Sequence, residues 1–414
     1  MNLSFFISNR ISTQTDGSFS STINRIAIVS IALGLSVVII AFMVLYGFKT
    51  EIKSKIYSFS GHLIISKYTL STSYEETSIV VSDSLTSTLE KYPLTRQFQP
   101  FAMKAGLIRA LRKNTASEGS EDIQGVIFKG VDHRFDTAYF KKHIIEGRFP
   151  DFSDKGYSTE VLFSKKVANY LRVETGDEAM IYFVQDPPRY RKLQVVGVYE
   201  TGLEEFDEKI ILGDIDLVRR INNWPDSLAG GIEVFITDID QLDEAEIDLL
   251  NTLDIDLYVD KVTDKYVQIF DWLNLLNRNV AILLAIILFV AGTSIISILL
   301  ILIMERTQMI GLMKAIGAGN RLIRSVFIWN GVLLIAKGLL WGNIIGLSLG
   351  LAQAYLKIIP LDSSTYYMDH VPIEIDIPTI LSLNLLVLVL IGLTLLIPVS
   401  IISRVKPVKA IRFD

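Results

Sequence analysis

Long apolar runs near both ends of the chain enclose a long polar stretch. Ile26 to Leu45 contains no charged residue and has about the 20 residues that a helical membrane span requires. Three more apolar runs follow the polar stretch. The pattern predicts four transmembrane helices, over residues 25–47, 279–304, 322–357 and 379–403.

The polar stretch, residues 48–271, is long enough for one or two compact domains. Short strand-like runs such as His62–Ser66 and Leu193–Tyr199 alternate with amphipathic helical stretches such as Leu242–Leu253. Two prolines within Gln185–Arg189 indicate a hairpin turn, because proline cannot join a central strand ladder. We therefore expect an α-helical membrane protein with a large α+β domain inserted between its first and second helices.

The placement of charge predicts the orientation of the spans. Basic side chains gather in 305–321 and in the tail 404–414, whereas acidic side chains dominate the loop 358–378. Basic loops are typical of the cytoplasmic side of a membrane. Both ends of the chain, 1–24 and 404–414, are therefore expected in the cytoplasm, and the domain 48–271 is expected outside it.

The composition and the motifs of the chain argue against several classes of function. Half of the residues are hydrophobic and 21% are charged, and the two kinds are segregated along the chain. A net charge of -5 gives no indication of a nucleic-acid partner. There is no cysteine, and the four histidines are scattered without metal-ligand spacing, so we expect no metal site. No phosphate-binding glycine loop or serine-nucleophile motif occurs, and we expect no catalytic residues.

The third span has a glycine every fourth residue, at Gly338, Gly342, Gly346 and Gly350. In a helix these positions form one stripe, which predicts a face for close helix packing. The same span contains Lys337, the main ionisable residue inside a predicted span. The sequence leaves open whether Lys337 pairs with a neighbour or with a lipid headgroup.

A short basic segment punctuated by glycines, Glu305–Gly319, connects the second and third spans. Its residues Glu305-Arg306, Gly311 and Met313–Ala318 strongly resemble the cytoplasmic coupling segment of ABC permeases of the MacB/FtsX superfamily. The tail, Arg404–Arg412, resembles the C-terminal signature of that family. An ordinary basic loop between spans is the alternative interpretation.

Two further stretches are similar to one branch of this superfamily, the lipoprotein-releasing LolC/LolE permeases. They are Arg25–Gly34 with Tyr46-Gly47-Phe48 in the first span, and Tyr366–Asp369 in the last external loop. The resemblance covers essentially the whole chain. It implies a MacB-like periplasmic core domain over 48–271 and an FtsX-like permease domain over 272–414.

The resemblance also implies a function. Such a permease is a subunit of an ATP-driven complex in the inner membrane of a Gram-negative bacterium. The complex extracts lipoproteins from the outer leaflet and hands them to a periplasmic carrier. The expected partners are a dimer of ABC ATPase subunits, a second permease subunit, lipidated cargo and a periplasmic carrier. ATP and Mg would be bound by the ATPase, so the chain itself is not expected to be an enzyme.

Two groups of site residues follow from the resemblance. The expected ATPase-coupling surface comprises Glu305, Arg306, Met309, Gly311, Met313, Lys314, Ala315 and Gly317. The expected lipoprotein-binding residues are Phe42, Met43, Tyr46, Phe48, Tyr366 and Tyr367. Aromatic residues at membrane interfaces are commonly anchors in the headgroup region, and that interpretation of the second group stays open.

The sequence departs from the LolC pattern at one place. The hairpin Val184–Tyr190 is short, which favours either a LolE-like role or a different mode of carrier docking. A homodimer and a heterodimer are both compatible with the chain. Two other functions compete: an efflux permease like MacB, and a regulator like FtsX that transmits mechanical force to a cell-wall hydrolase. MacB-like pumps usually carry a fused ATPase domain, and FtsX-like regulators typically have a smaller outer domain.

Overall fold

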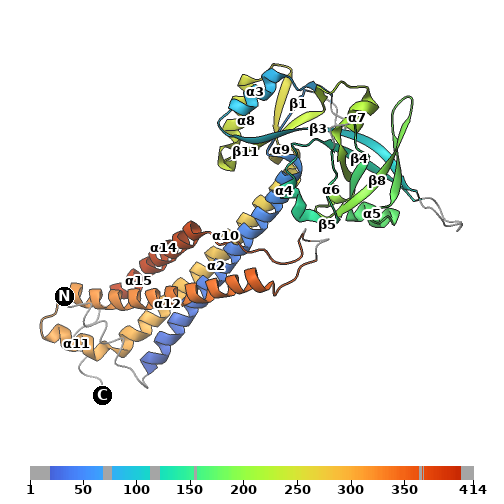
Figure 1. Cartoon of the computed structure of the whole chain (residues 1–414). Coiled ribbons are helices and arrows are strands. Elements are labelled where there is room, and N and C mark those ends of the chain that lie inside the picture. The colour runs from blue at the N-terminus through green and yellow to red at the C-terminus, as the bar shows by residue number, and fades with distance from the viewer. Residues whose placement is uncertain are drawn as a thin grey trace. The chain divides into compact units, whose positions relative to one another are not determined.

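A computed structural model describes residues 19–68, 77–111, 122–152, 156–362, 366 and 368–401. The chain divides into two compact units (Figure 1). The helical unit comprises residues 1–50, 271–360 and 370–414, and the sheet unit comprises 51–270 and 361–369. The expected cytoplasmic tail, 404–414, and the greater part of the expected lead-in, 1–24, lie outside the described residues.

Four helices in the described part of the chain are long and apolar enough to cross a membrane. They are α2 (Phe19–Ser60), α10 (Val267–Glu305), α12 (Asn320–Leu356) and the pair α14 (Ile377–Thr394) and α15 (Leu396–Ile401). Helix α2 has 42 residues, and at about 1.5 Å per residue it is roughly twice as long as the hydrocarbon layer is thick. Its last ten residues belong to the sheet unit.

The last helix is interrupted at Leu395, between α14 and α15. Pro398 explains the break, because proline lacks an N–H and its ring clashes with the carbonyl four residues earlier. At the other end, Asp376 caps α14 by accepting a hydrogen bond from Thr379 N at 3.0 Å.

The four long helices share one apolar core. It contains side chains from α2, α10 and α12 and from the stretch of α14 and Leu395. The residues are Ile31, Leu35, Ile39, Met43, Ala291, Ile295, Leu299, Ile335, Ile380, Val387, Ile391 and Leu395. The described span segments therefore form one packed bundle.

The sheet unit is built on a sheet of ten strands in the described residues. The order is β12-β1-β11-β3-β4-β9-β6-β8-β5, and β7 pairs with both β3 and β8. The strands are β1 (Leu63–Lys67), β3 (Thr95–Ala110), β4 (Ile123–Val131), β5 (Ile144–Gly147), β6 (Glu160–Ser164), β7 (Glu178–Phe183), β8 (Arg189–Tyr199), β9 (Ile210–Asp214), β11 (Gly231–Ile236) and β12 (Leu257–Lys261). A separate small pair joins β2 (Ile79–Val80) to β10 (Leu228–Ala229).

Helices cover the sheet in two groups, each with its own core. In one group, α3 (Asp83–Lys91) and α8 (Leu242–Thr252) pack on β1, β3, β11 and β12. In the other, α5 (Lys165–Leu171) and α7 (Ile215–Asn222) pack on β4 and β6 to β9. Shorter helical turns are α4 (Thr137–Phe140), α6 (Glu204–Asp207) and α9 (Val262–Lys265). The expected mixture of strands and amphipathic helices is confirmed, as is the hairpin, where Phe183 pairs with Arg189.

A buried ion pair joins the C-terminal end of α2 to the middle of the sheet. Lys129 Nζ lies 2.5 Å from Glu233 Oε1, with side-chain exposures of 0% and 1%. The same ammonium donates to the carbonyl of Phe59, in the last turn of α2, and lies 4.8 Å from the centre of the Phe59 ring. Gln99 Nε2 donates to Glu233 Oε2 at 2.7 Å. A cation at this position complements the negative end of the helix dipole.

Candidate functional site

The segment between α10 and α12 forms a short helix and a tight turn. Helix α11 (Thr307–Ala315) begins directly after Arg306, and Thr307 Oγ1 donates to Ile303 O at 3.1 Å. The turn that follows passes through Gly317 with φ +94. Residues with a Cβ rarely adopt this backbone conformation, so a glycine at this position gives the turn at little steric cost.

One face of α11 packs on its neighbouring helices. Ile310 and Gly311 are buried, and Ile310 joins a cluster with Leu302, Ile303, Ile323, Phe327 and Val399. Met309 and Met313 are partly buried against that cluster. Apolar contacts on both sides therefore hold α11 in position between α10 and α12.

The opposite face presents apolar side chains to the exterior. Leu312 is 59% exposed and Ile316, four residues later, is 78% exposed. Among the expected coupling residues, Glu305, Ala315 and Gly317 are exposed, Arg306, Met309, Met313 and Lys314 are partly exposed, and Gly311 is buried. The expected coupling surface did not include Leu312 and Ile316. Apolar residues occur on more than one face of this helix, so the sequence pattern alone does not show which face is packed.

The expected lipoprotein-binding residues fall into both units. Phe42 and Tyr46 lie one turn apart on α2, with ring centres 6.3 Å apart, and Phe48 is partly exposed. Met43 is 2% exposed and belongs to the bundle core. Tyr366 belongs to the sheet unit and is 45% exposed. Tyr367 lies outside the described residues.

The end of the loop between α12 and α14, and the first turn of α14, lie against α2 near Tyr46. Glu374 N donates to Met43 O at 3.1 Å, and Thr379 Oγ1 donates to Tyr46 Oη at 3.4 Å. A Cβ at Gly47 would lie 2.5 Å from Pro372 O, a backbone atom, so only glycine permits this approach. The amide of Gln353 also accepts from Ile359 N at 3.0 Å and fixes the start of the loop.

The four glycines of α12 face α2. All four are buried, and they meet in order Ile31, Leu35, Ile39 and Met43. A Cβ at Gly342 would lie 2.9 Å from Leu35 Cβ and 3.0 Å from Ala32 O. Since each contact advances by four residues on both helices, α2 and α12 run parallel with a fixed register. The absence of side chains on α12 allows this close packing.

A pair of asparagines joins α12 to α14. Asn343 Nδ2 donates to Asn384 Oδ1 at 2.7 Å, and Asn384 Nδ2 donates back to Asn343 Oδ1 at 2.9 Å. Each amide also donates to the carbonyl four residues earlier in its own helix. The reciprocal bonds satisfy two polar side chains at a position where water is scarce.

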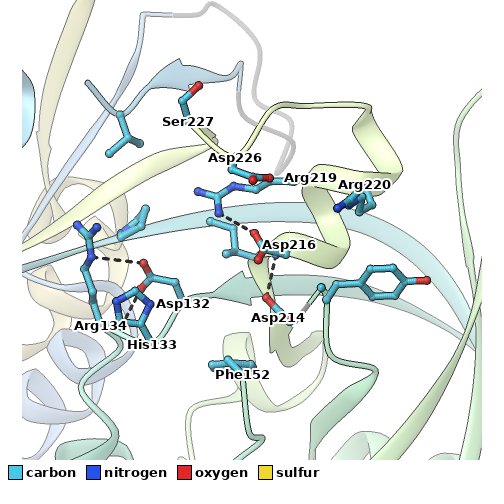
Figure 2. A pocket seen from close by; sticks show the side chains of 15 residues that line it. Asp132, His133, Arg134, Phe152, Asp214, Asp216, Arg219, Arg220, Asp226 and Ser227 are labelled. Atoms are coloured by element: carbon cyan, nitrogen blue, oxygen red, sulfur yellow. Dashed lines mark hydrogen bonds and ion pairs between the residues drawn. The ribbon is translucent and has the colours of Figure 1, made fainter. Parts of the chain in front are cut away.

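The sheet unit contains a cavity of about 410 Å³, lined mainly by the loop after β4, the end of β9, α7 and the loop after α7 (Figure 2). Asp132 and Asp214 follow or end the parallel strands β4 and β9, and burial raises the pKa of both carboxyl groups. Asp132 Oδ2 lies 3.6 Å from Arg134 Nε, and Asp216 Oδ1 lies 2.7 Å from Arg219 Nη1. Asp132 and Asp216 thus have partners within the cavity wall. The described residues contain no group of three or more metal-ligating side chains.

The hairpin of β7 and β8 has an exposed aromatic face. Tyr182 and Tyr190 lie opposite each other, 36% and 63% exposed, with ring centres 6.1 Å apart. Leu107 pairs with Tyr182 and is 46% exposed, and Arg109 lies 5.5 Å from the Tyr182 ring. This face, defined by Leu107, Tyr182 and Tyr190, is called the hairpin face below.

Comparison with known protein families decides the class of the chain. The model of the MacB-like periplasmic core domain matches residues 26–251, more than half of the sequence. The chain belongs to this family. The model of the FtsX-like permease C-terminal domain matches residues 281–407. The MacB-like chain is therefore an ABC transporter permease with a periplasmic domain, and the resemblance to the MacB/FtsX superfamily is confirmed.

Several relatives match over almost their whole length. The chain is 21% identical to "Lipoprotein-releasing system transmembrane protein LolC" of Xylella fastidiosa, covering 96% of this chain and 95% of the relative. It is 22% identical to the LolE protein of Haemophilus influenzae, covering 99% of each. Among solved structures, the periplasmic region of MacB from Actinobacillus actinomycetemcomitans matches at 14% identity and a TM-score of 0.34, covering 50% of this chain and 92% of that one.

Proposed function

We propose that this MacB-like chain is a permease subunit of an ATP-driven lipoprotein-releasing complex in the inner membrane of a Gram-negative bacterium. It would extract lipoproteins from the outer leaflet and pass them to a periplasmic carrier. The observation that carries the proposal is the match to relatives named as lipoprotein-releasing proteins, which extends over both domains in the same order.

The proposed topology has four spans with both termini in the cytoplasm. Because the MacB-like domain follows α2, the C-terminal end of α2 faces the periplasm, and α11 then lies on the cytoplasmic side. The basic residues around α11 support this orientation. ATP and Mg would be bound and hydrolysed by a separate ABC ATPase dimer, with which a second permease subunit completes the complex.

The outward face of α11 is proposed to dock on that ATPase. Leu312 and Ile316 would fill an apolar cleft, and Glu305, Arg306 and Lys314 would orient the contact. We expect the double variant Leu312→Ser, Ile316→Ser to copurify with the ATPase at least tenfold less, since burying each apolar side chain contributes about 1.5–3 kcal/mol. Met304→Ser is the control, because Met304 is 75% exposed but lies outside α11. Equal retention by all three proteins would refute this docking face.

Lipidated cargo is proposed to enter from the side, beside Phe42 and Tyr46. Extraction removes acyl chains from the lipid, at about 0.8 kcal/mol per buried CH₂. An apolar surface on the permease offsets that cost. Met43 is closed off in the bundle core, so its contact with cargo would require the helices to separate. Carrier docking is proposed at the hairpin face, whose exposed tyrosines are typical of protein contact surfaces.

A photocrosslinking experiment in membranes tests the proposal. Photoreactive residues are placed at Met43, Tyr46, Tyr366 and Tyr367, with Tyr355 as the control, because this aromatic is 82% exposed at the end of α12. Lipoprotein is expected to crosslink at the first four positions, to remain bound without ATP and to leave when ATP is added.

Other outcomes favour the competing functions. If only phospholipid crosslinks at all five positions, the aromatics are interfacial anchors and the cargo site is refuted. Capture of a cell-wall hydrolase would favour a regulator like FtsX. ATP-dependent loss of a crosslinked toxin or peptide, with no lipoprotein, would favour an efflux permease like MacB.

A further inference from the structure

Lys337 is exposed on the outer surface of α12, inside a stretch that is long and apolar enough to cross a membrane. Among the described residues no ion pair or hydrogen bond of its side chain is found. A charged side chain inside a membrane is costly unless it has a partner or reaches the headgroup region.

The packing of α12 on α2 fixes the depth of Lys337. Gly338 faces Ile31, and the two helices run parallel, so Lys337 is level with Ser30. Ser30 lies five residues above Arg25, the last charged residue before the apolar run, which corresponds to about 7 Å along the helix. Tyr46, at the other end of the run, is about 24 Å away. Lys337 is therefore near the inner boundary of the hydrocarbon layer.

A second copy of this chain would offer Lys337 no carboxylate partner within the membrane. No Asp or Glu occurs in residues 26–50, 272–304, 306–361 or 377–401. A second copy would therefore bring no carboxylate to this depth. The nearest anionic groups are the phosphates of the cytoplasmic leaflet, and a lysine on its four-carbon stem can reach them from within the apolar layer.

The surface beside Lys337 suits the rest of a phospholipid. Leu340, Trp341 and Ile344 lie three, four and seven residues later, on the same face of α12, and are 60%, 54% and 46% exposed. These side chains extend from Lys337 toward the centre of the membrane, along the direction that an acyl chain takes. Trp341 adds an amphipathic ring of the kind that is enriched near headgroups.

We propose that Lys337 and the adjacent face of α12 bind an anionic phospholipid of the cytoplasmic leaflet, with the phosphate on Lys337 and an acyl chain along Leu340, Trp341 and Ile344. The bound lipid fixes the depth of α12, the helix that follows the coupling turn. This site does not depend on the nature of the cargo.

Native mass spectrometry of the full-length chain tests the site with two probes, phosphatidylglycerol and phosphatidylcholine of identical acyl chains. Lys337→Met is expected to weaken phosphatidylglycerol binding about fivefold, the effect of one basic residue near an anionic surface, and to leave phosphatidylcholine unchanged. Lys337→Arg should retain the preference. Lys357→Met is the matched control, because Lys357 is an exposed lysine that caps the C-terminal end of the same helix, far from Lys337.

Three results would overturn the proposal. The first is phosphatidylglycerol binding by Lys337→Met that equals binding by the native chain. The second is an equal loss of phosphatidylglycerol and phosphatidylcholine binding, which would indicate a general packing defect. Lys337→Gln serves as a second variant if Lys337→Met does not purify as a folded protein. A photoreactive residue at Leu340 is expected to capture lipid. The third overturning result is capture of a polypeptide at this position, which would show that a protein subunit covers this face.

Discussion

The buried ion pair between Lys129 and Glu233 gives the prediction with the largest expected effect. Replacing Lys129 by Met keeps a stem of similar length and removes the charge. Glu233, 1% exposed, would then retain only the hydrogen bond from Gln99, and the carbonyl of Phe59 would lose its ammonium donor. Breaking a buried pair on one side typically costs about 3–5 kcal/mol, because the remaining charge is left uncompensated.

Removing both charges should be less harmful than removing one. In the double variant Lys129→Met, Glu233→Leu no charge remains buried, and such replacements are often neutral. Gln99 Nε2 would now lose its acceptor and the carbonyl of Phe59 would again lack its donor, at about 1–3 kcal/mol for each buried group. We therefore expect the double variant to be more stable than Lys129→Met alone, although less stable than the native chain.

Hydrogen exchange of the full-length protein in detergent measures this effect locally, on peptides from β4 and β11, the strands that carry the pair. Lys166→Met is the control, since Lys166 pairs with Glu204 at 2.7 Å on the surface, with 41% of its side chain exposed. An exposed pair is worth about 0–1 kcal/mol. If Lys129→Met loses no more protection than Lys166→Met, the buried pair does not stabilise the sheet.

Three further predictions concern packing and pH. Gly342→Leu should destabilise the helical unit by about 1–3 kcal/mol, because the new side chain would be overpacked against α2. Gly392→Leu is the control, since a Cβ at Gly392 meets nothing within 4 Å. In detergent titrations Gly392→Leu should unfold like the native chain. Asn343→Leu should cost about 0.6–2 kcal/mol by leaving Asn384 without its partner. If the loss in Asn343→Leu, Asn384→Leu equals the sum of the losses in the two single variants, the two side chains are not coupled. Burial lowers the pKa of His62 from its usual 6.5 to about 4, with a contribution from Arg96. The unfolded state therefore binds the proton first, and stability should fall as the pH drops from about 6.5 to about 4, by up to about 3 kcal/mol. A His62→Gln variant should show a shallower pH profile in thermal unfolding, and an unchanged profile would contradict this assignment.

The sequence alone predicts those features of the fold that depend on a local pattern of residues. The charge-free run Ile26–Leu45 and the prolines of the β7–β8 hairpin led to a span and a turn, and α2 and the hairpin are present. The sheet order was not predictable, because pairs such as β4 with β9 join strands far apart in the sequence. Their register depends on contacts that a local pattern does not encode.

The candidate site, too, could be predicted from the sequence only in part. The glycine spacing of α12 predicted a packing face, but nothing in the spacing specified α2 as the helix that lies against it. In α11 the residue types indicated a contact segment, whereas the outward position of Leu312 and Ile316 depends on Ile310 being packed between α10 and α12. The roles of the expected coupling and lipoprotein-binding residues stay predictions.

The pairing of β1 with β12 has a consequence for how such permeases diversify. These strands are the first and the last of the ten-stranded sheet, and they lie side by side, with Leu63 opposite Lys261. The chain therefore enters and leaves the sheet at one place, as an inserted domain does when its termini are close together. Everything between the two strands can grow, shrink or be exchanged for a related domain without changing the distance between the entry and exit points. The inserted domain can thus be exchanged as a unit, and new periplasmic partners can be acquired while the membrane helices keep their packing.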